Sequence, residues 1–430
     1  MPAQELPTTP SRLPAHVPTP PASEILGVLA RGAVRCDFQP IVDLDTRAVV
    51  AYEALARGPQ GALERPDVLF AAARSAGRLA QLDELCRRTA LNSAVTQQIR
   101  SPLALFINVE PQALRLAALD ELLEIADASA NSMQLVLEVT ERALAAQPAE
   151  LLATVRWLRS AGWRIALDDV GADDLSLAFM SVLRPDILKI DMGVVQRRPD
   201  AAVAMLMNAI NAHAERSGCL VLAEGIEDES HLAQAHALGA TLGQGWMFGR
   251  PQGTVPPPMS VAPLQLAPAV FHGTTRTPFG LVPPSTPTRV SRKPLLIQVS
   301  KHLERQAGTI GPTCVVLSAF QADRYFTPAT QRRYHRLREQ VGFVAVMGTD
   351  LLSEPMPGVR GASLDINDPL CMEWDIVVIS PHFAAALLAR DLGDAGPDAD
   401  RRFEFVLTYD RDTVVAAAES LIARVHGTTG

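Results

Sequence analysis

The sequence predicts an α/β protein in which a closed barrel of strands and helices precedes a smaller α/β domain. Short, almost wholly apolar runs alternate with helix-like stretches about eight times within residues 24–252. Such strands are typical of a parallel sheet that helices cover on both faces. About eight units in roughly 230 residues favour a closed (β/α)8 barrel over an open sheet.

An open, doubly wound sheet is the alternative for this pattern. That fold places a glycine-rich phosphate loop after its first strand, and the sequence has no such loop. We expect barrel strands at residues 38–42, 103–109, 133–139, 163–167, 186–190, 219–223 and 241–248. We expect helices at residues 67–76, 79–98, 113–126, 149–160, 201–217 and 229–238.

Composition divides the 430 residues into four parts. Residues 1–23 are rich in proline and polar residues, so we expect a disordered tail. Residues 253–292 are again rich in proline and are expected to form a semi-rigid linker. The patterned segments are expected to fold as a barrel, residues 24–252, and as a second domain, residues 293–430.

The overall composition is that of an ordinary globular protein, with 48% hydrophobic and 20% charged residues. A net charge of -8 argues against non-specific binding to nucleic acid or an anionic membrane. The five cysteines are widely spaced without a C-x-x-C pair, which indicates neither a zinc site nor a disulfide framework. With no apolar run long enough to span a bilayer and no signal peptide, we expect a cytoplasmic protein.

Polar side chains follow the apolar runs at the point where each expected strand ends. One such residue is ordinary, but six or seven in succession are different, because the carboxyl ends of all barrel strands meet at one mouth. The residues are Glu53, Asn108, Glu138, Asp168, Asp169, Lys189, Glu224 and Gln244.

Carboxylates packed this closely repel one another unless cations neutralise them. Oxygen-rich sites of this kind suit hard divalent ions such as Mg²⁺, Mn²⁺ or Ca²⁺. The adjacent pair Asp168 and Asp169 allows one carboxylate to bridge two ions, an arrangement that activates water for displacement at phosphorus. Lys189 is the one cation of the set; it either holds and helps to deprotonate this water or balances charge, and we favour the first.

At these residues the sequence resembles the EAL family of bacterial cyclic di-GMP phosphodiesterases. The resemblance covers about residues 24–251, with eight motifs in the family's order. The stretches are residues 39–43 (QPIVD), 52–57 (YEALAR), 107–109 (INV), 137–141 (LEVTE), 167–171 (LDDVG), 188–191 (LKID), 223–227 (AEGIE) and 244–251 (QGWMFGRP).

The resemblance implies a TIM-like barrel that hydrolyses cyclic di-GMP to linear pGpG with two Mg²⁺ or Mn²⁺ ions, acting as a homodimer through the barrel. It implies metal ligation by the six oxygen-bearing residues Glu53, Asn108, Glu138, Asp168, Asp169 and Glu224. It implies catalytic roles for Lys189, Gln244 and Glu141, substrate contacts from Arg57 and Gln39, and supporting roles for Asp191 and Glu227.

One loop departs from the family's pattern. After Asp168 and Asp169 the family usually continues Phe-Gly-Thr-Gly, whereas this chain has Val170-Gly171-Ala172-Asp173. In the family this loop links metal binding to the dimer interface and to activation. Ala172 lacks a hydroxyl that Glu141 could use. We therefore expect the metal centre to be complete and the rate and its dependence on dimerisation to be altered.

The C-terminal segment is expected to be a small regulatory α/β module. We expect strands at residues 314–319, 343–347, 376–380 and 403–407, and helices at residues 295–305, 328–340 and 412–424. It resembles the DICT sensory domain, most suggestively at residues 320–326 and 374–375. It shows no acid cluster or nucleophile and base pair, so we expect it to respond to an unidentified ligand or protein.

Three hypotheses follow. The first is an active phosphodiesterase that the C-terminal domain regulates. The second is a weakly active or inactive cyclic di-GMP receptor that signals through that domain; receptors usually lose the acids or the lysine, and all are present here. The third is a barrel hydrolase for another phosphodiester.

Overall fold

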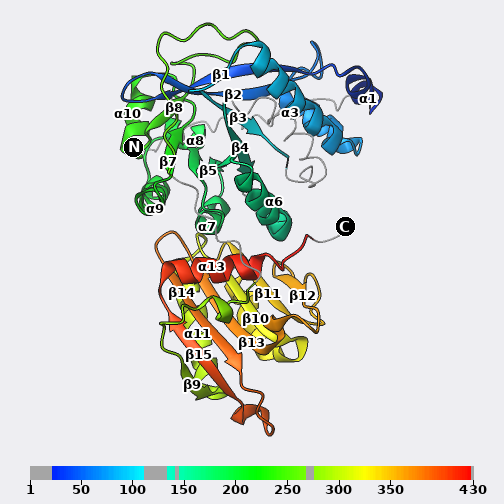
Figure 1. Cartoon of the computed structure of the whole chain (residues 1–430), viewed down its shortest axis with the longest axis vertical. Coiled ribbons are helices and arrows are strands. Elements are labelled where there is room, and N and C mark those ends of the chain that lie inside the picture. Colours follow the sequence, from blue (N-terminus) through cyan, green and yellow to red (C-terminus); the bar gives the residue numbers. More distant parts are fainter. Residues whose placement is uncertain (1–21, 111–132, 141–144, 268–275, 428–430) are drawn as a thin grey trace, which may run out of the picture.

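The structure, a computed structural model, describes residues 22–110, 133–140, 145–267 and 276–427. It consists of an N-terminal barrel and a C-terminal sheet domain that lie one above the other (Figure 1). None of the described helices is long and apolar enough to cross a membrane.

Eight strands close the barrel in sequence order, which confirms the predicted fold class. One feature differs from a uniform parallel repeat, because the first strand is antiparallel to both of its neighbours. The strands are β1 (Arg35–Asp43), β2 (Val49–Arg57), β3 (Ala104–Asn108), β4 (Gln134–Thr140), β5 (Arg164–Val170), β6 (Ile187–Ile190), β7 (Leu220–Ala223) and β8 (Leu242–Gln244).

The described helices of the barrel cover its outer surface. Several begin at an aspartate whose carboxylate accepts backbone N–H groups of the first turn, for example Asp200 and Asp228. The helix expected at residues 113–126 lies outside the described residues. The helices are α1 (Ala22–Arg31), α2 (Pro66–Ser75), α3 (Leu79–Thr96), α6 (Pro148–Ser160), α7 (Asp174–Leu183), α8 (Met192–Gln196), α9 (Ala201–Ser217) and α10 (Glu229–Ala237).

The barrel interior is filled by apolar side chains from all eight strands. Ala51, Phe106, Val136, Ala166 and Leu222 belong to this buried cluster, together with Ile41, Ile187 and Leu242. Because side chains alternate across a strand, the residue two positions further along each strand also points inward. These apolar side chains, which we call the floor, therefore close the interior. A second layer of side chains lies directly above them.

The C-terminal domain is a seven-stranded mixed sheet in the order β12-β11-β10-β13-β14-β15-β9. Strand β9 lies within the stretch that the sequence predicts as linker. The elements are β9 (Arg289–Arg292), α11 (Lys293–Ile310), β10 (Val315–Ala322), α12 (Pro328–Leu337), β11 (Phe343–Thr349), β12 (Arg360–Ser363), β13 (Glu373–Ile379), β14 (Ala384–Asp391), β15 (Arg402–Thr408) and α13 (Arg411–Ile422).

The two faces of this sheet pack against different partners. Val316 and Val378 belong to a cluster with residues of α11 and α12. Val315 and Val377, one position earlier on the same strands, belong to a cluster that includes α13 and the outer layer of the barrel. Successive side chains point to opposite faces, so α13 lies between the sheet and the barrel (Figure 1).

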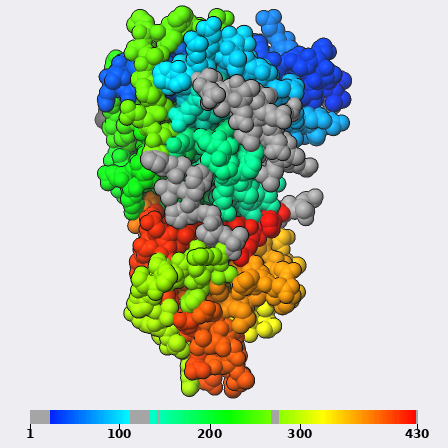
Figure 2. Space-filling view, viewed as in Figure 1, coloured from blue at the N-terminus to red at the C-terminus, as the bar shows by residue number. Residues whose placement is uncertain are grey.

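The contact between the domains is apolar at its centre. The rings of Phe179 on α7 and Phe343 on β11 lie 4.9 Å apart, and Ala149 N donates to Val425 O at 3.1 Å. In the space-filling view the red surface of α13 lies directly below the barrel (Figure 2). The packed core therefore runs from the barrel wall into the second domain.

Candidate active site

The predicted polar residues form a layer directly above the apolar floor of the barrel. Glu53, Asn108 and Glu138 each lie two residues beyond a floor residue of the same strand, namely Ala51, Phe106 and Val136. The same spacing places Asp168, Lys189, Glu224 and Gln244 in this layer and, on antiparallel β1, Gln39. Strand alternation alone therefore directs these side chains to a common point at the carboxyl ends of the strands.

Lys189 lies at the centre of this layer and is 1% exposed. Its ammonium nitrogen Nζ is surrounded by carboxylates from four different strands or strand ends. The distances are 2.6 Å to Glu138 Oε1, 2.8 Å to Glu224 Oε1, 3.0 Å to Asp168 Oδ1 and 3.7 Å to Glu53 Oε1. One ammonium thus faces four carboxyl groups.

Amide side chains hold Glu53 in place on its other side. Asn108 Nδ2 donates to Glu53 Oε1 at 2.9 Å, and Gln244 Nε2 donates to Glu53 Oε2 at 2.5 Å. Gln244 Nε2 also donates to Gln39 Oε1 at 3.1 Å, and Gln39 Nε2 donates to Gly249 O at 3.0 Å. This network fixes the carboxylate plane of Glu53 before anything else binds.

The buried charges perturb one another. Burial, with Glu53 and Asp168 adding repulsion, holds the pKa of Glu138 well above its usual range. Burial raises the pKa of Glu224 to about 8. Burial alone would lower the pKa of Lys189, but the surrounding carboxylates outweigh it and raise that pKa well above its usual range. The lysine is therefore an ammonium in the protein as it stands.

The acidic layer suits cations in its chemistry. Four carboxylates share one ammonium: Oε1 of Glu138 and Oδ1 of Asp168 contact Lys189 Nζ, and among the described residues Oε2 of Glu138 has no hydrogen-bond partner. The described side chains do not form a ready-made ring of three metal ligands, because Lys189 Nζ takes the point on which they converge. Hard divalent ions fit this donor set once Lys189 Nζ and the carboxylates move apart.

Three predicted residues differ from this layer in position. Asp169 has a left-handed backbone conformation, with φ of 56°, where the register between β5 and β6 shifts. It lies three residues beyond the floor residue Ala166 rather than two, so strand alternation does not place it in the layer. Asp191 caps α8, with its Oδ1 accepting from Gly193 N at 2.8 Å. Glu141 lies outside the described residues.

A cavity of about 740 Å³ opens above the acidic layer, and Arg57 and Glu227 line it. Arg57 Nε lies 3.0 Å from Asp37 Oδ2. Exposed apolar side chains of Met192 and Trp246 also line it, and the guanidinium of Arg250 lies 3.8 Å from the centroid of the Trp246 ring. The cavity is large enough for a dinucleotide-sized ligand that buries most of its surface.

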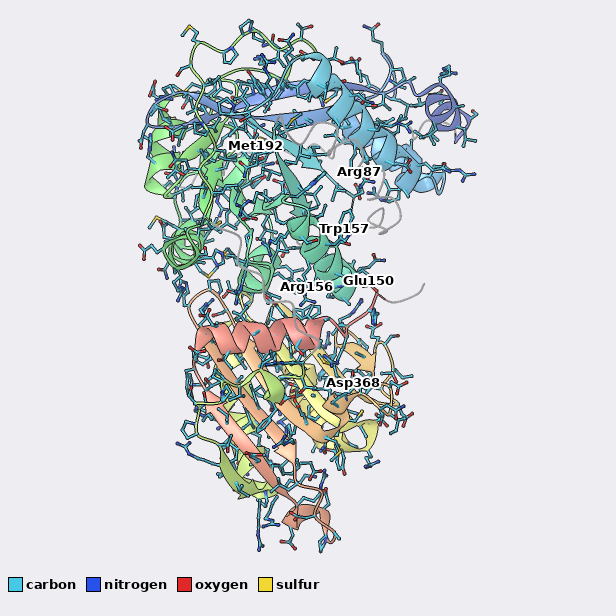
Figure 3. The ribbon with its side chains drawn as sticks, viewed as in Figure 1. Arg87, Glu150, Arg156, Trp157, Met192 and Asp368 are labelled. Atoms are coloured by element: carbon cyan, nitrogen blue, oxygen red, sulfur yellow. The ribbon has the colours of Figure 1, made fainter. Side chains whose placement is uncertain are left out.

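Sequence reasoning missed a buried pair in the wall of this cavity. Arg87 Nη1 lies 2.8 Å from Asp83 Oδ2, and Asp83 Oδ1 accepts from Glu110 N at 2.8 Å. Burial raises the pKa of Asp83 to about 6. Figure 3 shows Arg87 on α3 below the first strands. The available signal was an Asp and an Arg four residues apart on an otherwise apolar helix face.

Fold and site together define an α/β-barrel protein whose polar centre lies at the carboxyl ends of the strands, where barrel enzymes carry their active sites. Residues 23–251 match the EAL domain family. Residues 276–392 match the DICT family, described as a sensory domain in diguanylate cyclases and two-component systems.

The chain belongs to the EAL family, since that match spans more than half of its residues. It is 31% identical over 222 residues to the probable cyclic di-GMP phosphodiesterase PdeB of Escherichia coli K12, covering 50% of this chain and 42% of that protein. It is 26% identical over 240 residues to the cyclic di-GMP phosphodiesterase RocR of Pseudomonas aeruginosa, covering 54% of this chain and 61% of that protein.

A solved calcium and cyclic di-GMP complex of Klebsiella pneumoniae BlrP1 superposes with a TM-score of 0.46 at 26% identity, covering 52% of this chain and 57% of that one. The chain spans less than two thirds of the length of the curated relatives named above.

Proposed function

We propose that this protein is a cyclic di-GMP phosphodiesterase that uses two divalent ions, Mg²⁺ or Mn²⁺, and releases linear pGpG. The observation that carries the proposal is the acidic layer itself: four carboxylates around one ammonium, beneath a cavity of about 740 Å³. Membership of the EAL family and the names of its relatives support the choice of substrate.

In this proposal the metal ligands are the oxygen-bearing residues predicted from the sequence. When bound, the ions supply a nucleophilic water and neutralise charge on the phosphoryl oxygens. The chain orients the ligands: Asn108 and Gln244 hold Glu53, and the strands place the rest. The six ligands are Glu53, Asn108, Glu138, Asp168, Asp169 and Glu224.

Lys189 would hold the attacking water and guide its proton toward the acids around it. This role is supported by its burial and by its contacts with all four carboxylates. Gln244 Nε2 keeps the far side of Glu53 hydrogen-bonded and also donates to Gln39, which lines the cavity and is a proposed substrate contact. Arg57 lines the cavity, where a guanidinium suits a phosphate. Glu141, Asp191 and Glu227 keep their proposed supporting roles.

A cyclic di-GMP receptor of weak or no activity is the second candidate. Lys189 Nζ stands where a cation would bind, and the loop after Asp169 lacks the family's usual residues. Divalent ions must displace the ammonium from this position, and a slow displacement would leave a protein that binds its ligand without hydrolysing it.

We further propose that the C-terminal domain regulates the barrel. Helix α7 starts five residues after Asp169 and packs against α13 near its other end, at Ser181, which gives a direct route between the domains. Dimerisation through the barrel is also proposed; because α13 contacts α7, such a dimer would use other barrel surfaces. A cytoplasmic location stays a prediction.

Hydrolysis of cyclic di-GMP by the purified chain, with Mn²⁺ or Mg²⁺ and pGpG followed by chromatography, tests this function. We expect Glu53→Gln to lower kcat by roughly 100-fold or more, the scale of losing one preorganised electrostatic group. Glu24→Gln is the matched control, because Glu24 is exposed on α1 and does not line the cavity.

The outcomes separate the candidates. Product formation that depends on a divalent ion and on Glu53 supports the enzyme. Tight binding of cyclic di-GMP by calorimetry without any pGpG supports the receptor. Turnover that is unchanged in Glu53→Gln would contradict the assigned site.

A further inference from the structure

A second polar cavity lies at the joint between the two domains, away from the barrel mouth. We call it the joint cavity; its volume is about 290 Å³. Its charged lining comes from both domains: four arginines (Arg159, Arg184 and Arg216 from the barrel, Arg411 from α13), His213, and two acids, Asp186 and Asp412. Figure 3 shows Arg156 and Glu150 on the side of α6 that faces α13, beside this joint.

We propose that the joint cavity binds a phosphate-class anion, either inorganic phosphate or the phosphate group of a nucleotide. This site is distinct from the acidic layer of the barrel, and the proposal does not depend on the phosphodiesterase activity. Its basis is an excess of guanidinium groups over carboxylates, together with a buried imidazole that has a nitrogen without a partner.

Two of the arginines are bound only by neutral oxygens. Arg411 Nη2 donates to Ser181 Oγ and to Ser380 O, both at 2.7 Å, and Arg216 Nη2 donates to Pro381 O. In the described part of the chain neither forms an ion pair with an acid. The undescribed residues 268–275 contain no Asp or Glu, so they bring no carboxylate to this place.

The acids of the joint cavity are already shared with Arg164, Arg159 and Arg184, and neither pairs with Arg216 or Arg411 in the described part of the chain. Asp186 Oδ1 lies 2.9 Å from Arg164 Nη1, and its Oδ2 accepts from Ile165 N at 2.9 Å and lies 3.8 Å from Arg159. Asp412 is 4.0 Å from Arg184 and 88% exposed, so water weakens its effect. The lining as a whole keeps a positive excess.

Glu419 on α13 is likewise shared between two arginines. Its carboxylate lies 3.7 Å from Arg184 Nε and 3.7 Å from Arg156 Nη2, so one acid faces two guanidiniums. Arg184 Nη2 is buried and, within the described residues, has no hydrogen-bond partner. The acid recorded near that atom is Asp412, whose Oδ1 lies 4.0 Å away and which is 88% exposed, so the N–H groups of Nη2 are left for another acceptor.

His213 is the second, independent sign of a ligand. It is 6% exposed, and among the described residues its Nε2 has no hydrogen-bond partner. Burial, with Arg411 and Arg216 adding repulsion, lowers its pKa to about 4. The imidazole is therefore neutral at neutral pH, and it offers one N–H to an anion without adding charge.

The pKa of Arg411 points the same way. Burial, followed by repulsion from Arg216 and Arg184, lowers it to about 10. A buried guanidinium without a counter-ion destabilises a fold unless something compensates it. An anion in the cavity supplies that compensation.

Shape and size select the class of anion. A guanidinium presents two parallel N–H groups that match two oxygens of a phosphate, and several such groups around one cavity favour a tetrahedral oxyanion over a carboxylate. A volume of about 290 Å³ lies just below the usual range for whole small-molecule ligands. A phosphate or diphosphate group fits, with any nucleoside outside.

Direct titration tests the proposal with the full chain. Sodium phosphate is titrated by calorimetry at constant ionic strength, and the unfolding midpoint is followed in phosphate against chloride. We expect binding at millimolar or lower phosphate and a higher midpoint. Arg411→Gln and, separately, Arg216→Gln should weaken binding by at least about tenfold, the scale of a lost charged hydrogen bond.

Arg198→Gln is the matched control, because it removes the same charge from an exposed loop. Arg411→Lys keeps the charge and guards against loss of domain packing; it should retain part of the binding. A second titration with guanosine 5′-monophosphate identifies the source: tighter binding than phosphate, lost in Arg411→Gln, assigns the site to a nucleotide phosphate. Equal or weaker binding assigns it to inorganic phosphate.

Absence of phosphate-dependent heat and of any midpoint shift in the unaltered protein would overturn the proposal. So would binding that is the same in Arg411→Gln, Arg216→Gln and Arg198→Gln.

Discussion

The barrel mouth and the joint cavity are opposites in charge. In the mouth, four carboxylates surround one lysine; in the joint cavity, four arginines surround one histidine with few free acids. Both are largely buried, so water screens the excess less than it would at the surface. The comparison teaches that each centre is incomplete by itself, one lacking cations and the other lacking an anion.

The two centres also differ in what builds them. Strand alternation within one barrel sets the mouth, so it exists whenever the barrel is folded. The joint cavity takes Arg411 from the C-terminal domain and Arg216 from the barrel, so it exists only while the domains are docked. Changes at the mouth should therefore act mainly on the stability of the barrel, and changes at the joint mainly on docking of the domains.

Removing the lysine from the mouth gives the largest expected effect. Lys189→Met leaves four buried carboxylates without their cation, which we expect to destabilise the barrel by about 3–5 kcal/mol in the presence of a chelator. Mn²⁺ should restore part of this stability, because it takes over the role of the ammonium. Chemical unfolding with chelator and with Mn²⁺ measures both values.

Lys301→Met is the control for that experiment, since Lys301 lies on α11 of the other domain. Equal stability of the Lys189→Met protein and the unaltered protein under chelator would remove the charge argument for the mouth.

Acidification should affect the joint through His213. Its pKa in the folded protein is lowered to about 4, so between pH 6.5 and 4 the unfolded chain binds a proton that the folded chain does not. Folding stability therefore falls as the pH drops through this window, by roughly 2 kcal/mol at pH 5.

Unfolding measured against pH checks this sign. In His213→Gln that part of the pH dependence should disappear, whereas the exposed His236→Gln should retain it. An identical pH profile for all three proteins would show that the arginines of the joint do not act on this imidazole.

The smallest expected loss of stability comes from a change at the start of α7, the helix that runs from the loop after Asp169 to the joint cavity. Asp173 caps α7, its Oδ1 accepting from Leu175 N at 2.9 Å, so Asp173→Ala should cost about 1 kcal/mol. Asp173→Asn keeps the cap and should cost little. Hydrogen exchange of the first turn of α7 reads the loss locally; unchanged protection in the alanine variant would argue against the cap.

The hydrogen bond from Leu175 N to Asp173 also explains one way in which the loop after Asp169 departs from the family's pattern. The loop after Asp169 has an aspartate where the family has a glycine, and in the structure that aspartate begins a helix. A glycine there would leave the first turn uncapped. The substitution therefore stiffens the start of α7, which also carries Ser181, the partner of Arg411.

The barrel and its mouth could be predicted because both follow from local alternation. Apolar runs followed by an acid, as at Ala51 and Glu53, are visible in the sequence. The reversed direction of β1 was not predictable, since a strand's own pattern does not state its direction. Strand β14 is rich in alanine and leucine, which favour helices. It forms a strand because it pairs with β13 and β15.

The joint cavity had no sequence signal. Arg159 and Arg411 are about 250 residues apart, and each by itself is an ordinary arginine at a helix end. Only the docking of the domains brings them together. The pair Asp83 and Arg87 was predictable in part. Its spacing of four residues is visible in the sequence, but its burial in the cavity wall depends on the fold.

Strand β6 carries a residue of both centres. Asp186, immediately before it, lines the joint cavity, and Lys189, near its end, lies in the mouth; three residues of strand span roughly 10 Å. Over that distance opposite unit charges attract by on the order of 1–2 kcal/mol in a protein interior. An anion at one end and a metal ion at the other would therefore promote each other's binding reciprocally, through the field of the barrel and without any movement of the chain.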